Sequence, residues 1–244
     1  GSLVDYRLIN QPKIFTIIRY KVHKALNRLS KYNVFLRQLL SKSEVIYLRT
    51  NESLDLIPKT YREKVKIFLE TGVETENITN TIKQRQLIRI ITACRLIESK
   101  NVDQVIAIFH KIQDLVSHEI KLQVVGDGPL LNDLKKEHSS EFIEFLGKLP
   151  RCETLNCIGS ADLYLSCSIK EGGSHSLFES AALNCPIACY HISGMEIFPR
   201  DDSAIKIVPD YCIENNTSRL ADKVVQYFKN NLIDDICKRN QKDL

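Results

Sequence analysis

The chain has 244 residues, of which 43% are hydrophobic and 26% are charged, and it carries a formal net charge of +4. This length and composition are typical of an ordinary globular protein with one large core or two modest ones. No apolar run approaches the roughly 18 to 20 residues that span a bilayer, and no secretory h-region follows the N-terminus, which argues against membrane insertion and secretion.

The eight cysteines form neither a CxxC pair nor a Cys/His cluster. Four of them lie in or beside apolar stretches, where reduced cysteines behave as small hydrophobic residues: Cys94, Cys167, Cys185 and Cys189. The pattern predicts a protein of the reducing cytoplasm without a zinc site.

The positive charge is concentrated near the N-terminus. Nine Lys/Arg and no Asp or Glu lie between Tyr6 and Ser43. Within residues 13–40 apolar side chains recur at helical spacing between the basic ones, so a basic amphipathic helix is predicted. We favour a domain helix with a solvated basic face; the alternative is peripheral contact of residues 7–42 with an anionic membrane. Nucleic acid is not expected as a partner, because no stacking-aromatic motif accompanies the charge.

Further along, short apolar runs alternate with helix-period segments. The expected strands are residues 45–48, 65–69, 87–93, 121–125, 142–145, 161–166, 186–190 and 204–208, and the expected helices are residues 102–116, 130–137, 174–183 and 218–228. This alternation predicts the α/β class, with a Rossmann-like parallel sheet and helices on both faces. The polar stretch 74–86 divides the chain into domains of residues 1–72 and 73–244.

In open parallel sheets, ligands bind at the carboxyl ends of the strands. Arg95 and Lys100 follow one expected strand, GDGP (126–129) follows the next, LGKLP (146–150) a third, and EGGSHSLFE (171–179) a fourth. Each stretch alone is weak evidence. Their agreement on one edge of the sheet favours a binding site.

The fourth stretch has the chemistry of a phosphate site. Gly172 and Gly173 allow a close backbone approach, Ser174 can cap the next helix, and the N–H groups of that helix's first turn attract a phosphate. Arg95 and Lys100 could supply the positive charge that a leaving nucleoside diphosphate needs without a metal.

Two carboxylates complete this predicted donor site. Glu179 lies roughly 7 Å along the helix at 1.5 Å per residue, a reach suited to a ribose diol. Glu171, at the strand end, would face the sugar.

Residues 171–182, followed by Pro186-Ile187, resemble the E-x7-E motif of retaining GT-B glycosyltransferases of the GT4-type, or group 1, family. Arg95 and Lys100 are similar to the family's R-L-x-x-x-K element, residues 126–129 to its G-D-G-P turn, and Ala161-Asp162 to the Ala-Asp pair before E-x7-E. Residues 69–77 resemble the family's N-G-V-D segment, with Thr71 in place of Asn.

The resemblance implies a metal-independent glycosyltransferase of polysaccharide or glycoconjugate biosynthesis, without a cofactor. It would transfer a sugar, with retention of anomeric configuration, from a UDP- or GDP-sugar to a hydroxyl of a carbohydrate, lipid-linked or protein acceptor. Residues 73–244 would form the donor domain of a GT-B fold. Residues 1–72 would be the C-terminal remnant of the acceptor-side domain, so we expect this chain alone to be incomplete for catalysis.

The resemblance also assigns site residues. Its implied catalytic residues are Glu171, Arg95 and Lys100, with no metal ligand. The implied donor-binding residues are Gly126, Lys148, Gly172, Gly173, Ser174, His175, Ser176 and Glu179, although a solvated loop position is an equal alternative for His175.

The chain departs from the family pattern at Cys94 and Asn101, which flank the Arg/Lys element, and at Asn184, which replaces a Gly; none of these changes removes a charge that the chemistry needs. Two alternative functions stay open: a non-catalytic nucleotide-sugar-binding partner module, and a GT-B-like nucleotide-sugar epimerase.

Overall fold

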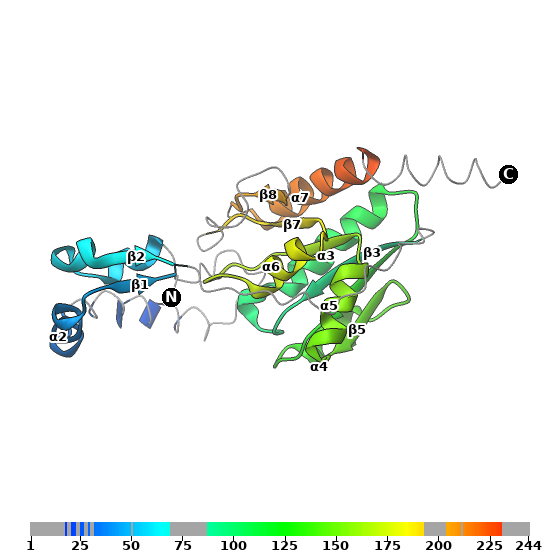
Figure 1. Cartoon of the computed structure of the whole chain (residues 1–244). Coiled ribbons are helices and arrows are strands. Elements are labelled where there is room, and N and C mark those ends of the chain that lie inside the picture. The colour runs from blue at the N-terminus through cyan, green and yellow to red at the C-terminus, as the bar shows by residue number, and fades with distance from the viewer. Residues whose placement is uncertain are drawn as a thin grey trace.

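The protein is represented by a computed structural model that describes residues 32–49, 51–68, 87–192, 204–210 and 212–230, together with the single positions Ile18, Lys21, Val22, Ala25, Leu26 and Leu29. Its larger sheet is six-stranded and entirely parallel, in the order β5-β4-β3-β6-β7-β8, with helices on both faces (Figure 1). The predicted α/β class, with a parallel sheet between helices, is confirmed.

Each predicted strand of this sheet forms within one or two residues of its expected bounds. The strands are β3 (Ile88–Ala93), β4 (Ile120–Val125), β5 (Ile143–Gly147), β6 (Leu163–Ser166), β7 (Ile187–Tyr190) and β8 (Ala204–Ile207). The helices are α3 (Val102–Leu115), α4 (Leu131–His138), α5 (Arg151–Ser160), α6 (His175–Ala182) and α7 (Ile213–Phe228). Helix α5 was not among the predicted helices.

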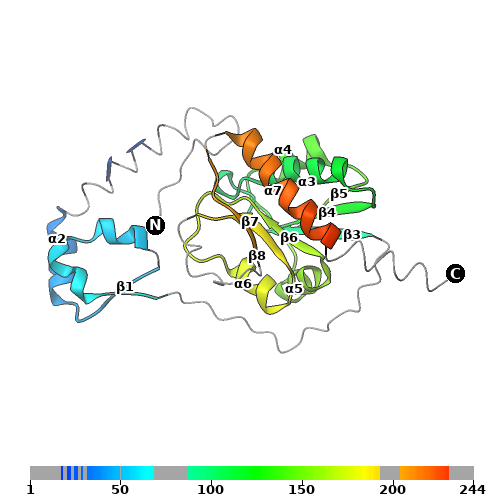
Figure 2. The same ribbon diagram turned by 90° about the horizontal axis from the view of Figure 1, so that it is seen from above.

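The helices form two layers because neighbouring strand residues point to opposite faces. On β3, Ile90 packs into a core with Phe109 of α3 and Leu220 of α7. The next residue, Ile91, packs into a second core with Ile158 of α5 and Leu177 of α6. Figure 2 shows α3 and α7 over one face of the sheet and α5 and α6 over the other.

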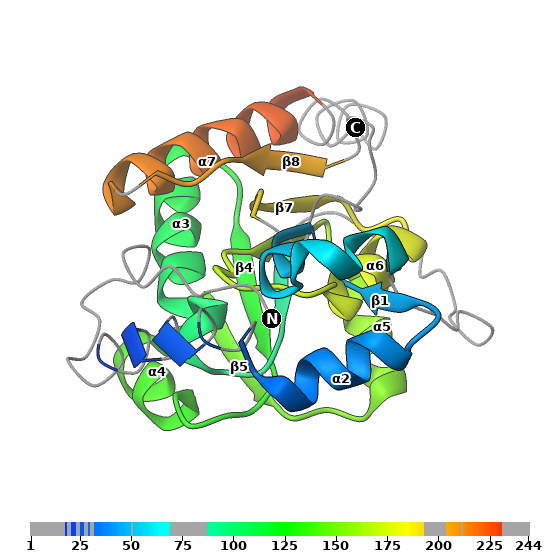
Figure 3. The same cartoon turned by 90° about the vertical axis from the view of Figure 1, so that its left-hand side faces the viewer.

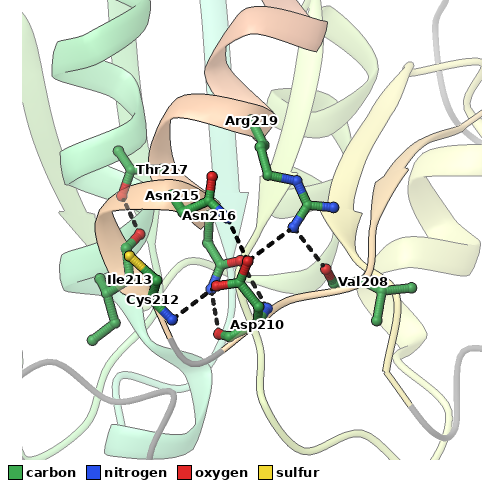
Figure 4. A network of polar contacts seen from close by, with 8 residues as sticks. All are labelled: Val208, Asp210, Cys212, Ile213, Asn215, Asn216, Thr217 and Arg219. Atoms are coloured by element: carbon green, nitrogen blue, oxygen red, sulfur yellow. Dashed lines mark hydrogen bonds and ion pairs between the residues drawn. The ribbon is translucent and has the colours of Figure 1, made fainter.

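Helices α3 and α7 lie next to each other in Figure 3 and are joined by a hydrogen bond from Gln104 Nε2 to Thr217 Oγ1. Helix α7 begins at Ile213, five residues before the predicted start. Figure 4 shows the reason: the Asp210 carboxylate accepts the Cys212 N–H at 2.8 Å, and the Asp210 carbonyl accepts Asn216 Nδ2 at 2.7 Å. These contacts fix the first turn before the apolar periodicity starts.

A second, two-stranded parallel sheet consists of β1 (Ile46–Leu48) and β2 (Val65–Ile67), with 3-10 helices at Asn51–Leu56 and Lys59–Lys64 between them. Helix α2 (Val34–Lys42) precedes β1 and contributes Leu40 to a small core with Ile46 and Ile57. Residues 69–86, where the domain boundary was predicted, lie outside the described residues.

The predicted basic helix is not continuous through residue 40. Residues Ile18, Val22, Leu26 and Leu29 are helical and exposed, but Tyr32 forms a turn. Helix α2 then starts anew, because the Asn33 side chain accepts the N–H groups of Phe35 and Leu36. Among the described residues, no helix is long and apolar enough to cross a membrane.

The direction of winding reverses between β3 and β6. The chain runs outward from β3 through β4 to β5, and then returns to β6 and runs outward the other way to β8. β3 pairs with β4 over six residues but with β6 only at Ile90–Leu163 and Ile91–Tyr164. Such a switch point opens a crevice at the carboxyl ends of the strands.

Candidate functional site

A cavity of about 740 Å³ lies at this crevice. Its walls come from the loops that follow β3, β4, β5 and β6, although these segments are far apart in the sequence. The lining residues are Ala93, Cys94, Arg95, Lys100, Val125, Gly126, Asp127, Gly128, Lys148, Leu149, Arg151, Thr154, Glu171, Gly173, Ser174, His175, Ser176 and Glu179.

The loop after β3 brings a cation to the carboxylate at the end of β6. A 3-10 turn at Glu98–Lys100 ends at Asn101, whose φ of 53° and ψ of 48° are left-handed. Asn is one of the few residues other than Gly that tolerate this conformation. Lys100 Nζ donates to Glu171 Oε1 at 2.5 Å, and both side chains are largely buried.

The loop after β4 supports this wall through its backbone. Gly126 has a φ of +136°, and a Cβ there would stand 1.8 Å from the Cys94 carbonyl oxygen. The Leu96 N–H donates to the Asp127 carbonyl at 2.9 Å. Only glycine fits between the two loops, so the GDGP stretch sets the position of the segment that carries Arg95.

The loop after β6 leads directly into α6. Gly173 takes a φ of 108°, and Ser174 is the N-cap residue. The expectation that the Ser174 side chain caps the helix is wrong: its Oγ makes no capping hydrogen bond and lies 3.2 Å from Ser176 Oγ. The first N–H groups of an α-helix have no intrahelical acceptor, so they are available to an anion in the cavity.

Glu179 projects into the cavity from the second turn of α6 and is paired with a residue that sequence reasoning missed. Arg151 Nη1 donates to Glu179 Oε1 at 2.6 Å. The Glu179 side chain is 8% exposed and the Arg151 side chain 57%. Arg151 is the first residue of α5, and the Pro150-Arg151 sequence was a detectable signal because proline is favoured at helix starts.

The loop after β5 closes the remaining side. Gly147 has a φ of 67° and its carbonyl accepts the Gly126 N–H at 2.8 Å. This contact joins the loop after β4 to the last residue of β5. The next residue, Lys148, therefore lies in the cavity wall.

Cys94, between β3 and Arg95, is a thiol and not a thiolate at neutral pH. Burial raises its pKa to about 11, although the nearby Lys100 charge opposes the increase. Cys94 therefore adds no negative charge to the wall that carries Arg95 and Lys100.

The structure thus gathers nearly all the predicted site residues around one cavity. Glu171, Arg95, Lys100, Gly126, Lys148, Gly173, Ser174, His175, Ser176 and Glu179 line it. Gly172 is not among the lining residues. Sequence reasoning missed Arg151 and Thr154, and it singled out Asp127 only as part of the GDGP stretch.

The chain is similar in sequence to a known glycolipid synthase. Alpha-monoglucosyldiacylglycerol synthase of Streptococcus pneumoniae is 29% identical over 151 residues, which are 53% of this chain and 34% of that protein. This chain therefore spans about a third of that relative's length.

Solved structures share the fold at lower identity. The pneumococcal O-GlcNAc transferase GtfA, crystallised with UDP and GlcNAc, is 19% identical with a TM-score of 0.58, over 80% of this chain and 40% of that one. WaaG, a glycosyltransferase involved in lipopolysaccharide biosynthesis, is 16% identical with a TM-score of 0.59, over 91% of this chain and 67% of that one. These neighbours are GT-B glycosyltransferases, which confirms the predicted GT-B type of fold.

The family described as "Glycosyl transferases group 1" matches residues 74–243, most of the chain and all of the six-stranded sheet with its cavity. The chain therefore belongs to the group 1 glycosyltransferase family.

Proposed function

We propose that the cavity binds a nucleotide diphosphate sugar and that the chain is the donor-binding part of a retaining, metal-independent, GT4-type hexosyltransferase. One observation carries this proposal. Cations, helix N–H groups and three carboxylates from four separate loops surround a single cavity at the switch point of the sheet.

In this proposal the diphosphate lies between Arg95 and the N-terminus of α6. The guanidinium and the helix N–H groups would stabilise the negative charge that develops on the leaving diphosphate, which is the contribution that a metal makes in other enzymes. Gly173 allows the phosphates to approach the backbone, and His175 and Ser176 offer further hydrogen-bond donors.

In this proposal Glu179 and Glu171 contact opposite ends of the donor. Glu179 would accept hydrogen bonds from the ribose diol, and Lys148 and Gly126 would lie against the nucleotide. Glu171 would face the sugar, where its charge stabilises an oxocarbenium-like anomeric carbon. Lys100, already paired with Glu171 at 2.5 Å, would hold that carboxylate in place and contribute charge near the phosphate.

Thermal stability in the presence of UDP, GDP, ADP and dTDP tests this donor site. We expect one nucleotide to raise the unfolding midpoint equally with and without magnesium, since a ligand that binds only the folded state adds about 2.7 kcal/mol at 100 times its Kd. UDP is the first choice, because it accompanies the related O-GlcNAc transferase. A midpoint that none of the four nucleotides moves would contradict the proposal.

Product analysis of the full-length protein separates the remaining functions, because this chain alone is expected to be incomplete for catalysis. With donor and acceptor, a transferase releases nucleoside diphosphate and a glycoside that keeps the donor's anomeric configuration, as NMR coupling constants report. An epimerase returns a nucleotide sugar, and a binding module leaves the donor intact. The acceptor is proposed to be a lipid-linked, carbohydrate or protein hydroxyl, with the lipid first because of the lipid synthase among the relatives.

We also propose that residues 7–42 contact an anionic membrane surface, which would make the protein cytoplasmic and membrane-peripheral. Most of this segment lies outside the described residues, but Ile18, Val22, Leu26 and Leu29 are helical and 52% to 62% exposed. Apolar side chains on an exposed basic helix match the chemistry of an anionic lipid surface. Co-sedimentation should be strong with vesicles containing phosphatidylglycerol and should weaken with salt; equal binding to neutral phosphatidylcholine vesicles would refute the contact.

A further inference from the structure

One buried side chain that the proposed reaction does not use lies directly beneath the cavity. Tyr164 of β6 is 1% exposed and is not among the residues that line the cavity, but two of its hydrogen-bond partners, Ala93 and Ser176, are. These partners belong to opposite sides of the switch point, since Ala93 ends β3 and Ser176 lies in the first turn of α6.

The Tyr164 hydroxyl completes the backbone pairing of β3. Pairing between β3 and β6 stops at Ile91–Tyr164, so β6 leaves Ala93 without a backbone partner on that side. There the hydroxyl accepts the Ala93 N–H at 3.2 Å and donates to the Ala93 carbonyl at 2.7 Å. A phenol oxygen thus takes the place of a neighbouring strand.

The same hydroxyl reaches α6. It is hydrogen bonded to Ser176 Oγ at 2.9 Å, and Ser176 Oγ lies 3.2 Å from Ser174 Oγ. A phenol has one proton and two lone pairs, so it can serve all three contacts only if Ser176 donates to it. Burial raises the pKa of the Tyr164 hydroxyl far above neutrality, so the proton given to Ala93 stays in place.

Both ends of this link are next to the proposed diphosphate site. Arg95 is two residues beyond Ala93, and Ser174 to Ser176 form the start of α6 and line the cavity. The spacing between the cation and the helix N-terminus therefore depends on how firmly the ends of β3 and α6 are joined.

We infer that Tyr164 is a positioning residue: its hydroxyl fixes the end of β3 to the start of α6 across the switch point and so sets the geometry of the diphosphate site. This inference rests on the proposed donor-binding function and adds to it a residue that never touches the ligand. The proposed base contacts lie on other elements, and the proposed ribose contact, Glu179, lies one turn further along α6 and is held by Arg151 of α5, so the effect should be largest for the phosphates.

Tyr164→Phe is the first test, because it keeps the buried ring and removes only the hydroxyl. We expect the affinity for the nucleoside diphosphate that binds the parent chain to fall about tenfold, the effect of losing one or two buried hydrogen bonds, while the affinity for the matching nucleoside stays within about twofold. Calorimetry or a competition assay measures both.

Tyr190→Phe is the matched control. Tyr190 is also a buried tyrosine of this sheet, on the adjacent strand β7, but its hydroxyl interacts with the Cys167 thiol, and neither residue lines the cavity. We expect it to leave the ratio of diphosphate to nucleoside affinity unchanged. The inference fails if Tyr164→Phe keeps the parent ratio, or if Tyr190→Phe changes the ratio as much.

A second test needs neither nucleotide binding nor a folded Tyr164 variant. In the ligand-free chain, Ser176→Ala should increase the hydrogen-exchange rate of the Ala93 amide several-fold. The substitution removes the Ser176 hydrogen bond that holds the Tyr164 hydroxyl, and this hydroxyl is the acceptor of the Ala93 N–H. Ser180→Ala, which removes another buried hydroxyl of α6, is the control and should leave that rate unchanged. An Ala93 rate unaffected by Ser176→Ala refutes the link, whether or not the donor function holds.

Discussion

Replacing Gly126 by alanine tests whether the loops after β3 and β4 are in contact. A Cβ at this position would stand 1.8 Å from the Cys94 carbonyl oxygen, whereas real Cβ contacts are essentially never under 3.0 Å. The loops would have to separate by about 1.2 Å, which stretches the hydrogen bonds from Cys94 N–H to Val125 and from Leu96 N–H to Asp127, now 3.0 and 2.9 Å.

The expected cost follows from these contacts. Two weakened hydrogen bonds account for about 2 kcal/mol, and the φ of +136° adds about 1 kcal/mol for alanine. We therefore expect Gly126→Ala to lower the free energy of unfolding by about 3 kcal/mol.

Gly172→Ala is the control for this prediction. No heavy atom lies within 4 Å of a Cβ built at Gly172, so its free energy of unfolding should change by less than about 0.5 kcal/mol. Urea denaturation followed by far-UV circular dichroism measures the parent and both variants. A Gly126→Ala midpoint equal to those of the parent and Gly172→Ala would show that the two loops are not in contact in solution.

Three further predictions concern single side chains of the cavity. Glu179→Ala should weaken nucleoside diphosphate binding about tenfold by removing the ribose contact, and calorimetry that gives the parent affinity would contradict this role. Arg95→Ala should weaken binding of the diphosphate much more than that of the nucleoside; equal losses for both ligands would exclude a phosphate contact. Because burial raises the Cys94 pKa to about 11, its thiol should resist iodoacetamide at pH 8 while the exposed Cys152 reacts, and peptide mass spectrometry showing equal labelling would contradict this.

The strands of the larger sheet were predictable because short, mostly apolar runs such as residues 87–93 are typical of a buried parallel strand. Helix α5 was not, because only Leu155 and Ile158 of its ten residues are buried and the others give no clear periodicity. The early start of α7 depends on Asp210 and Asn216, polar residues that a search for apolar spacing passes over.

The site residues that could be predicted follow a strand with a clear apolar pattern, and those that were missed depend on contacts between elements. Residues that follow a strand directly, such as Arg95 and Glu171, could be placed because the topology brings strand ends to one edge. Arg151 belongs to an unpredicted helix, and its contact with Glu179 depends on how α5 packs against α6. Tyr164 was counted only as a strand residue. Nothing in an apolar run shows that its hydroxyl will bond Ala93, where the pairing of β3 with β6 has ended.

The pairing of Glu171 and Glu179 with basic side chains has a consequence for the turnover of the proposed transferase. Within the part of the chain that the structure describes, the side chains that line the cavity are nearly balanced in charge, with four basic and three acidic groups: Arg95, Lys100, Lys148 and Arg151 against Asp127, Glu171 and Glu179. A nucleoside diphosphate carries more negative charge than the nucleotide sugar from which it forms. A wall made only of cations would hold that product more tightly than the substrate, whereas in the proposed transferase a nearly neutral wall would limit product inhibition and favour rapid departure of the spent nucleotide.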